Sequence, residues 1–445
     1  MSKFSVYQAI YEVSQHEKTV KKEIKTDAKM KQLERFMGVA LMLLALASCS
    51  SEEEESTTTD MLPKAKPMTL TAEQQTMVNE TNDFSFSLFR TIQQASPTQS
   101  LAFSPLSVVY NLGMINNGAT GQTQQEITST LGVSYGTERL NTLCQSLIEG
   151  LPEVDQDVDI LSANAIYTNK GFSLKDNYQK VVKNYYHADA QTLDFHSSKA
   201  LSTINGWAKK QTDGMIPQVL DDINADAVAY LLSSVYFKAT WTKKFDRAKT
   251  LQETFTTSTG VERHVPMMHN NAAILGYDTD DYTAICLPYG NGENWYMYIL
   301  LPAEGKTISD VASQLNGQTW SKIVQGRQSY ELDLKLPKFS TANKTDLSKP
   351  LIDMGIKRMF TRSAELREMC KETGVFVGEM FQKAKIDVDE EGTKASAVTV
   401  SGDWATGLHH SKFEKGEFHA NRPFVYVITE SSSNTIVFIG TYQGN

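Results

Sequence analysis

The sequence predicts an α+β fold with large mixed or antiparallel sheets. Residues 72–94 place apolar side chains at helical spacing, and further helical patterns crowd the first half of the chain. The second half carries short apolar runs rich in β-branched and aromatic residues, at 295–302, 332–339 and 435–440. Because helices and strands are concentrated in different halves, a regular alternation of strand and helix is not expected.

The composition bounds the possible functions. A chain of 445 residues with 40% hydrophobic residues can bury a large core, and from residue 70 to residue 445 it shows no linker or repeat, which predicts one domain. The net charge of -9 argues against a nucleic-acid binder, which needs a basic face. The four cysteines are far apart and lack metal-ligand spacing, so we expect isolated thiols.

The first 69 residues have the pattern of a targeting region. Residues 1–29 fit no part of a signal peptide, so we expect a start-site artefact, with Met30 as the true first residue. Residues 30–48 join a basic region to the apolar run "MGVALMLLALA", as in a lipoprotein signal peptide. Residues 49–69 are polar and acidic, which predicts a disordered tether.

The signal segment ends at a candidate lipidation site. Leu46-Ala47-Ser48-Cys49 resembles the bacterial lipobox, in which small residues precede a lipidated cysteine. The resemblance implies an outer-membrane lipoprotein with Cys49 as its anchor. The acidic run after Cys49 resembles the surface-export signal of Bacteroidetes lipoproteins, which implies a cell-surface location. An ordinary secretory signal that happens to contain a cysteine is the alternative.

A series of short motifs runs through the predicted domain in a fixed order. They begin with "FSPLSV", "NGATGQTQQEI", "INGWAKKQTDGMI" and "SSVYFKATWTKKFD", and continue with "VPMM", "LPYGNGENWYMYILLP", "LPKF", "FHANRPF" and "VFIGT". Their order over roughly the last 370 residues resembles the serpin family from end to end. That resemblance implies the serpin fold, in which helices pack around a large central sheet and an exposed reactive loop follows the hinge motif "EEGT".

The stretch "DVDEEGTKASAVTVSGDWATGLHH" matches the reactive loop of the family. Serpin loop insertion is itself a known example of strand addition to a sheet. An inserted strand alternates its side chains between two faces, and the face that starts at Thr393 carries only small residues, including Thr399 and Ser401. The resemblance assigns the hinge to six residues: Glu390, Glu391, Gly392, Thr393, Ala395 and Ala397.

Counting along the loop predicts the bond that a protease attacks. The family spacing from Glu390 places it between Thr406 and Gly407, within a range of Trp404 to Leu408. Thr406 suits a protease with a small apolar pocket, such as an elastase-like enzyme, whereas Leu408 suits a chymotrypsin-like one.

The resemblance also implies residues that allow the central sheet to open. Ser104, Ser107 and Asn205 match a polar cluster beneath the central strands, and Trp241 matches a tryptophan near the entry point of the loop. Gln382 stands where many relatives have histidine. Because glutamine does not titrate near neutral pH, we do not expect opening to be gated by pH.

Two functions from different classes follow. The first is a suicide inhibitor of serine or cysteine proteases, which traps the acyl-enzyme as the cleaved loop inserts. The second is a non-inhibitory serpin-fold binding module or simple protease substrate.

Neither function requires a catalytic residue, a cofactor or nucleic acid, and we expect a monomer. His409, His410 and His419 lack the spacing of a metal site, and no GxSxG, HExxH or P-loop motif occurs, so we expect no metal and no catalytic residues.

Overall fold

The strands form two mixed sheets. The computed structural model describes residues 66–133, 136–292, 294–378, 380–393 and 415–444. The first sheet has nine strands and the second has six, and each contains one parallel pair, β9 with β13 and β2 with β3. The prediction of an α+β fold with mixed sheets is therefore confirmed.

The strand bounds are as follows. The nine-stranded sheet runs in the order β1 (Leu101–Phe103), β15 (Thr435–Tyr442), β14 (Phe424–Glu430), β8 (Trp295–Pro302), β7 (Tyr282–Pro288), β6 (Glu262–Asp278), β9 (Gln328–Pro337) and β13 (Lys415–His419), and β5 (Leu251–Thr256) pairs with β6. The six-stranded sheet runs in the order β10 (Phe339–Asp346), β11 (Phe381–Val388), β12 (Gly392–Thr393), β4 (Ala229–Thr240), β2 (Val158–Asn169) and β3 (Asp189–Leu193).

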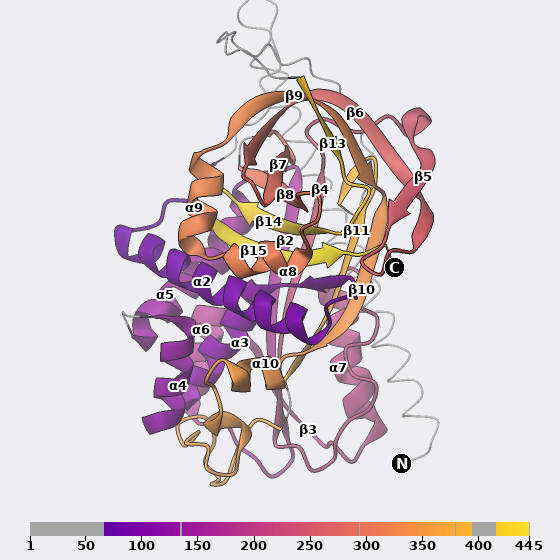
Figure 1. Cartoon of the computed structure of the whole chain (residues 1–445). Helices are drawn as coiled ribbons and strands as arrows, with labels where there is room; N and C mark the ends of the chain where they lie inside the picture. Colours follow the sequence, from indigo (N-terminus) through magenta and orange to yellow (C-terminus); the bar gives the residue numbers. More distant parts are fainter. Residues whose placement is uncertain (1–65, 134–135, 293, 379, 394–414, 445) are drawn as a thin grey trace, which may run out of the picture. The chain divides into compact units, whose positions relative to one another are not determined.

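Helices cover both faces of the six-stranded sheet. In Figure 1, α2 to α6 lie on one side of β2 and β4, and α7 lies on the other side. The helices are α2 (Ala72–Ala95), α3 (Pro105–Gly118), α4 (Gly121–Leu131), α5 (Thr137–Gly150), α6 (Asp176–Tyr186), α7 (Ser198–Gln211), α8 (Ile308–Gln314), α9 (Gly317–Gln325) and α10 (Ser348–Asp353), with 3-10 turns η1 (Leu151–Glu153), η2 (Arg247–Lys249) and η3 (Arg358–Phe360).

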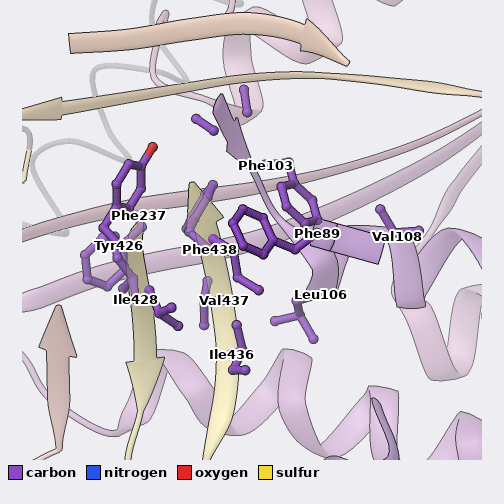
Figure 2. Packing of buried hydrophobic residues seen from close by; sticks show 14 of the residues in the cluster. Phe89, Phe103, Leu106, Val108, Phe237, Tyr426, Ile428, Ile436, Val437 and Phe438 are labelled. Carbon is purple, nitrogen blue, oxygen red and sulfur yellow. The ribbon is translucent and has the colours of Figure 1, made fainter. Parts of the chain in front are cut away.

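Helix α3 runs through the interior. Ser104 caps its first turn by accepting a hydrogen bond from the Ser107 amide at 3.3 Å, and Pro105 follows at the first helical position, where its missing N–H has no intrahelical partner to lose. Thirteen of the 14 residues of α3 are buried, so the helix is enclosed on all sides. Figure 2 shows Phe89 and Phe103 packed beside Phe438 of β15 at the start of this helix.

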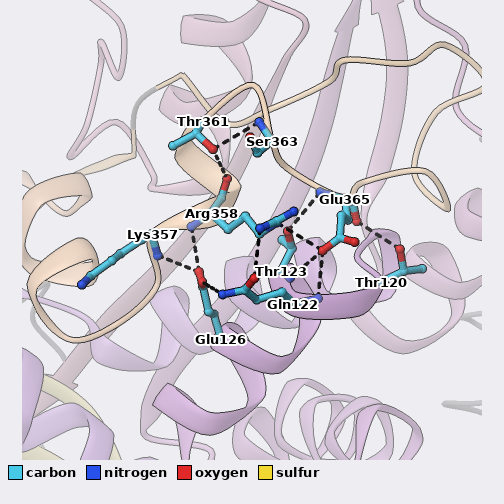
Figure 3. Close-up of polar contacts among 9 residues, drawn as sticks. All are labelled: Thr120, Gln122, Thr123, Glu126, Lys357, Arg358, Thr361, Ser363 and Glu365. Carbon is cyan, nitrogen blue, oxygen red and sulfur yellow. Dashed lines mark hydrogen bonds and ion pairs between the residues drawn. The ribbon is translucent and has the colours of Figure 1, made fainter.

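The motif "NGATGQTQQEI" builds the start of α4. The Glu365 carboxylate accepts the Gln122 amide at 2.8 Å, and Glu126 accepts the Arg358 amide at 2.7 Å (Figure 3). A Cβ at residue 121 would lie 2.5 Å from Glu365 Oε1, and its φ is +56°. Only glycine fits there without strain, which gives Gly121 a physical role in the motif.

A second, smaller core lies on the other face of the six-stranded sheet. It joins β2 to α7 and to the segment that follows α7. Its buried members are Ala165, Tyr167, Phe195, Ala200, Ile204 and Leu220, and Tyr230, Leu232 and Phe381 pack against them. The six-stranded sheet is thus enclosed on both faces, and this enclosure positions the candidate site.

Candidate functional site

Two neighbouring strands of the six-stranded sheet leave a gap between them. β12 pairs with β11 at one residue, Thr393 with Val388, and pairs with β4 through Gly392 and Thr393. Beyond β12, no direct pairing joins β4 to β11 in the described part of the chain. We call the gap between β4 and β11 the slot. The two residues of β12 occupy only its upper end.

Cavities lie along the slot. A cavity of about 30 Å³ separates residues 233–237 of β4 from residues 382–385 of β11. A second cavity of about 290 Å³ lies between residues 229–232 of β4 and residues 375–378, 380 and 381. The hydroxyls of Ser233 and Ser234, which face the first cavity, are buried and have no hydrogen-bond partner among the described residues. Such groups destabilise a sheet until a partner reaches them.

Polar side chains beneath the slot tie β11 to α3. Gln382 Oε1 accepts the Ser104 amide at 2.7 Å, and Gln382 Nε2 donates to the Ser104 carbonyl at 3.0 Å and to the Ser107 hydroxyl. Three of the residues expected to allow opening therefore meet. The structure brings Ser233 of β4 to this cavity as well.

The expected position of Asn205 is wrong. It lies on α7, on the opposite face of the sheet from α3, where its side-chain oxygen accepts the amides of Val219 and Leu220, each at 2.8 Å. Its amide nitrogen donates to the Leu220 carbonyl at 2.9 Å. The Asn205 side chain forms hydrogen bonds with the backbone of the segment that follows its own helix. It therefore does not join Ser104, Ser107 and Gln382.

The two hinge carboxylates are held by cations. Glu390 is 2.9 Å from Lys338 and accepts the Thr250 hydroxyl at 2.9 Å. Glu391 is 2.7 Å from Lys244 and 3.3 Å from Arg247. Burial by itself would raise the pKa of Glu390, but hydrogen bonds from Lys338, from its own amide and from Thr250 outweigh burial and lower it. The charged form of Glu390 is therefore the stable one at neutral pH.

The next two residues enter the sheet. Gly392 has φ +152°, and a Cβ there would come within 2.1 Å of the Ala239 carbonyl oxygen, so no other residue fits. Thr393 is 1% exposed, and its hydroxyl lies 2.6 Å from the Tyr289 hydroxyl. The first residue of the small-residue face thus lies on the inner side of the sheet.

Trp241 supports this junction. Its ring stacks on Tyr289 with centroids 4.4 Å apart, and its indole N–H donates to the Asp389 carbonyl at 2.9 Å. Its backbone amide donates to the Glu391 carbonyl at 2.8 Å. Trp241 therefore lies beside Gly392 and Thr393, at the entrance of the slot.

The Glu390 contact predicts a dependence of stability on pH. The pKa of the Glu390 carboxyl is lowered in the folded protein. Its ion pair therefore stabilises the fold fully at pH values above the pKa of an unfolded glutamate, and this stabilisation is lost as the pH falls through the pKa of the folded state. The melting temperatures of the wild type and Glu390→Gln should differ most at pH 7 and converge toward pH 3. A constant difference across that range would contradict this account.

Some expected residues lie outside the described part of the chain. These are Cys49, Ala395, Ala397, Thr406 and Gly407.

Other residues of the site were not expected. Tyr289 and Lys338 belong to the motifs "LPYGNG" and "LPKF", so their positions were marked in the sequence but not their partners. Lys244 likewise belongs to the motif "SSVYFKATWTKKFD", whereas Arg247 and Thr250 belong to none of the quoted motifs. Only the fold brings these three residues to the hinge.

The described residues hold neither a cluster of three metal-ligating side chains nor a helix of the length and apolarity that a membrane span needs.

A family model and individual relatives match this chain. The model for serpins, serine protease inhibitors, matches residues 79–443. A serpin-like protein from Thermococcus kodakarensis is 30% identical over 374 residues, which cover 83% of this chain and 85% of that protein. The plasma serine protease inhibitor of Homo sapiens is 31% identical over 366 residues, which cover 80% of this chain and 87% of that protein.

Solved structures share the fold. The native state of tengpin, a thermophilic serpin, has a TM-score of 0.77 at 27% identity, covering 86% of this chain and 98% of that one. Thyroxine-binding globulin in complex with thyroxine has a TM-score of 0.75 at 26% identity, covering 83% of this chain and 99% of that one.

These likenesses agree with the order of motifs in the sequence and with the sheets and helices of the structure. The family model and the human relative are named as protease inhibitors, in agreement with the prediction that the chain is not an enzyme. The chain belongs to the serpin family.

Proposed function

We propose that this serpin is a suicide inhibitor of serine proteases, and also of cysteine proteases, that inserts its cleaved loop into the slot. The observation that carries the proposal is the slot itself. Among the described residues, its two parallel strand edges are joined only by Gly392 and Thr393, and cavities and unpartnered hydroxyls lie along it. A sheet with this gap gains hydrogen bonds when one more strand enters.

The pairing of β12 sets the register of the inserted strand. Gly392 and Thr393 lie opposite Thr240 and Ala239 of β4, so each later residue would lie opposite one residue earlier in β4. Continued in this way, Thr399 would lie opposite Ser233, and on its other side Gln382 of β11. Its hydroxyl could then bond to the unpartnered Ser233 hydroxyl.

The same register explains why the inward residues must be small. Ala395 and Ala397 would lie opposite Phe237 and Val235, side chains that already pack against the core. A large side chain at either position would compete for filled volume, which costs about 1 to 3 kcal/mol. The alternation of small residues therefore matches the packing beneath the slot.

The chemistry begins as an ordinary acyl transfer. The serine or cysteine of the protease attacks the carbonyl carbon of Thr406, the bond to the nitrogen of Gly407 breaks, and that nitrogen leaves with a proton as a free amine. The residue count favours Thr406, and hence an elastase-like partner. Insertion then carries the acylated protease away from the site of attack before water reaches the ester or, for a cysteine protease, the thioester, and deformation of its oxyanion hole stops hydrolysis.

A non-inhibitory role is the alternative, and the likeness to thyroxine-binding globulin favours it. That protein is crystallised with a small ligand, so the fold also serves for binding. In such a role the loop would be cleaved without trapping the protease, or would not be presented to one.

Incubation with a panel of serine and cysteine proteases separates the two functions. An inhibitor forms a complex that survives a denaturing gel and releases a fragment whose N-terminus identifies the cleaved bond. Cleavage of every molecule without a complex, for each protease of the panel, would support the alternative.

The lipobox supports a further part of the proposal, that Cys49 anchors the protein to the outer membrane at the cell surface. Cys49→Ala should move the protein from the membrane fraction to the soluble fraction, because the lipid chains then have no attachment point. Ser50→Ala, one residue beyond the expected site, is the matched control and should remain in the membrane fraction. Membrane association of Cys49→Ala equal to that of the wild type would disprove the anchor.

A further inference from the structure

The slot is covered on its outer side by the segment that follows α7. The first cavity, of about 30 Å³, is lined by Thr212, Met215 and Ile216 as well as by Ser104 and Ser107. The second cavity, of about 290 Å³, is lined by Asn224 and Ala227. We call residues 212–227 the roof. A strand that enters the slot must lie between the roof and α3.

One edge of the roof is attached to α7 and β4. Asn205 of α7 bonds to the backbone of residues 219 and 220, and the amide of Asn224 donates to the Tyr230 hydroxyl of β4 at 2.9 Å. Leu220 is 3% exposed in the second core. These contacts do not cross the slot, but they loosen when the roof lifts away from α7, which exposes the amides of Val219 and Leu220.

The other edge of the roof is attached across the slot. The Asp221 carboxylate lies 2.8 Å from Lys383 of β11 and 3.5 Å from Lys344 of β10. The two lysines are direct partners in the pairing of β10 with β11. Like charges directly opposite each other repel, so one carboxylate between them both joins the roof to the strands and neutralises the pair.

We propose that Asp221, with Lys383 and Lys344, forms an ionic clasp that holds the roof over the slot and limits the rate at which the cleaved loop inserts. This inference rests on the proposed function. A loop that drags a protease at its end cannot thread through an enclosed channel, so the roof must lift. The clasp is the charged contact that crosses the slot and must break when it does.

The chemistry of the clasp suits a contact that opens repeatedly. The Asp221 side chain is 60% exposed and Lys344 is 45% exposed, whereas Lys383 is 20% exposed. Hydrogen bonding from Lys383, followed by the other contacts with the two lysines, lowers the pKa of Asp221, so the clasp remains charged at neutral pH. Salt screens exposed ion pairs. The clasp therefore makes insertion sensitive to ionic strength.

The test compares Asp221→Asn with the wild type in the full chain. Asp222→Asn removes the same charge one residue away, where no ion pair is formed with Lys383 or Lys344, and is the matched control. Two quantities are measured at low and high salt: the rate of complex formation with pancreatic elastase, and hydrogen exchange at the amides of Val219 and Leu220. The second measurement needs no protease.

Asp221→Asn should speed both processes by about two- to five-fold at low salt, the range expected for an exposed ion pair, and its rates should depend less on salt than those of the wild type. Asp222→Asn should match the wild type. If the wild type forms the complex and Asp221→Asn forms it no faster, the clasp is wrong and the proposed function stands.

If the wild type forms no complex with any protease of the panel, the proposed function fails instead. The hydrogen-exchange result then decides the clasp alone: unchanged exchange at residues 219 and 220 in Asp221→Asn would overturn it.

Discussion

Thr393→Arg is expected to convert the inhibitor into a substrate. Thr393 is buried on the inner face of β12, beside Tyr289, and is the first residue that the sheet accepts. The Thr393 hydroxyl contacts the uncharged Tyr289 hydroxyl, so burying a guanidinium at this position should cost several kcal/mol. The expected result is at least a tenfold rise in the amount of serpin needed to inhibit one protease molecule, while cleavage of the loop continues.

Thr393→Val is the matched control. It keeps the shape of threonine and removes only the hydroxyl that meets Tyr289, so its cost should be about 1 kcal/mol and inhibition should be largely retained. Gel-stable complex at the wild-type stoichiometry from Thr393→Arg would show that residue 393 does not have to enter the sheet.

The fold was predictable because its signals are local and repeated. The helix predicted at residues 72–94 is α2, and the apolar run at 295–302 is β8, because each is long or apolar enough for its period to be unambiguous. The alternation beginning at Thr393 predicted its inward direction, because a strand has a strict period of two.

The contacts across the site were not predictable. Glu390 reads in the sequence as one of several acids, and its partner Lys338 lies 52 residues away. Asn205 lies in a recognised motif, but its partners could not be predicted from that motif. Its side chain bonds to the segment that follows its own helix. Position in a motif predicts an element, whereas the partner of a side chain depends on which elements the fold brings together.

The enclosure of the slot was also hidden in the sequence. "PQVLDDINAD" reads as an ordinary polar connection, and nothing in it marks Asp221 as the residue that crosses to β11. Only the position of α7 over the sheet gives that carboxylate two lysines to contact.

Cleavage of the loop is expected to raise the melting temperature by at least about 10 °C. Insertion would give the facing edges of β4 and β11 a strand between them, with roughly ten new ladder hydrogen bonds worth about 0.5 to 1.5 kcal/mol each, and would fill the cavities beneath. Ordering the loop costs about 1 to 2 kcal/mol per residue, so packing of the small inward face must supply the surplus.

The measurement is a thermal melt of the uncut and cut protein, with N-terminal sequencing of the released fragment. The fragment should begin at Gly407, and Thr406→Arg should shift preference toward trypsin-like proteases without changing the rise, because the protease pocket contacts that side chain while the sheet contacts the hinge. Cleavage within the tether at residues 49–69 is the control and should leave the melting temperature unchanged. A fragment beginning outside Ala405 to His409 would disprove the residue count. A cut loop without a rise in melting temperature would favour the non-inhibitory function, since the slot would then have remained empty.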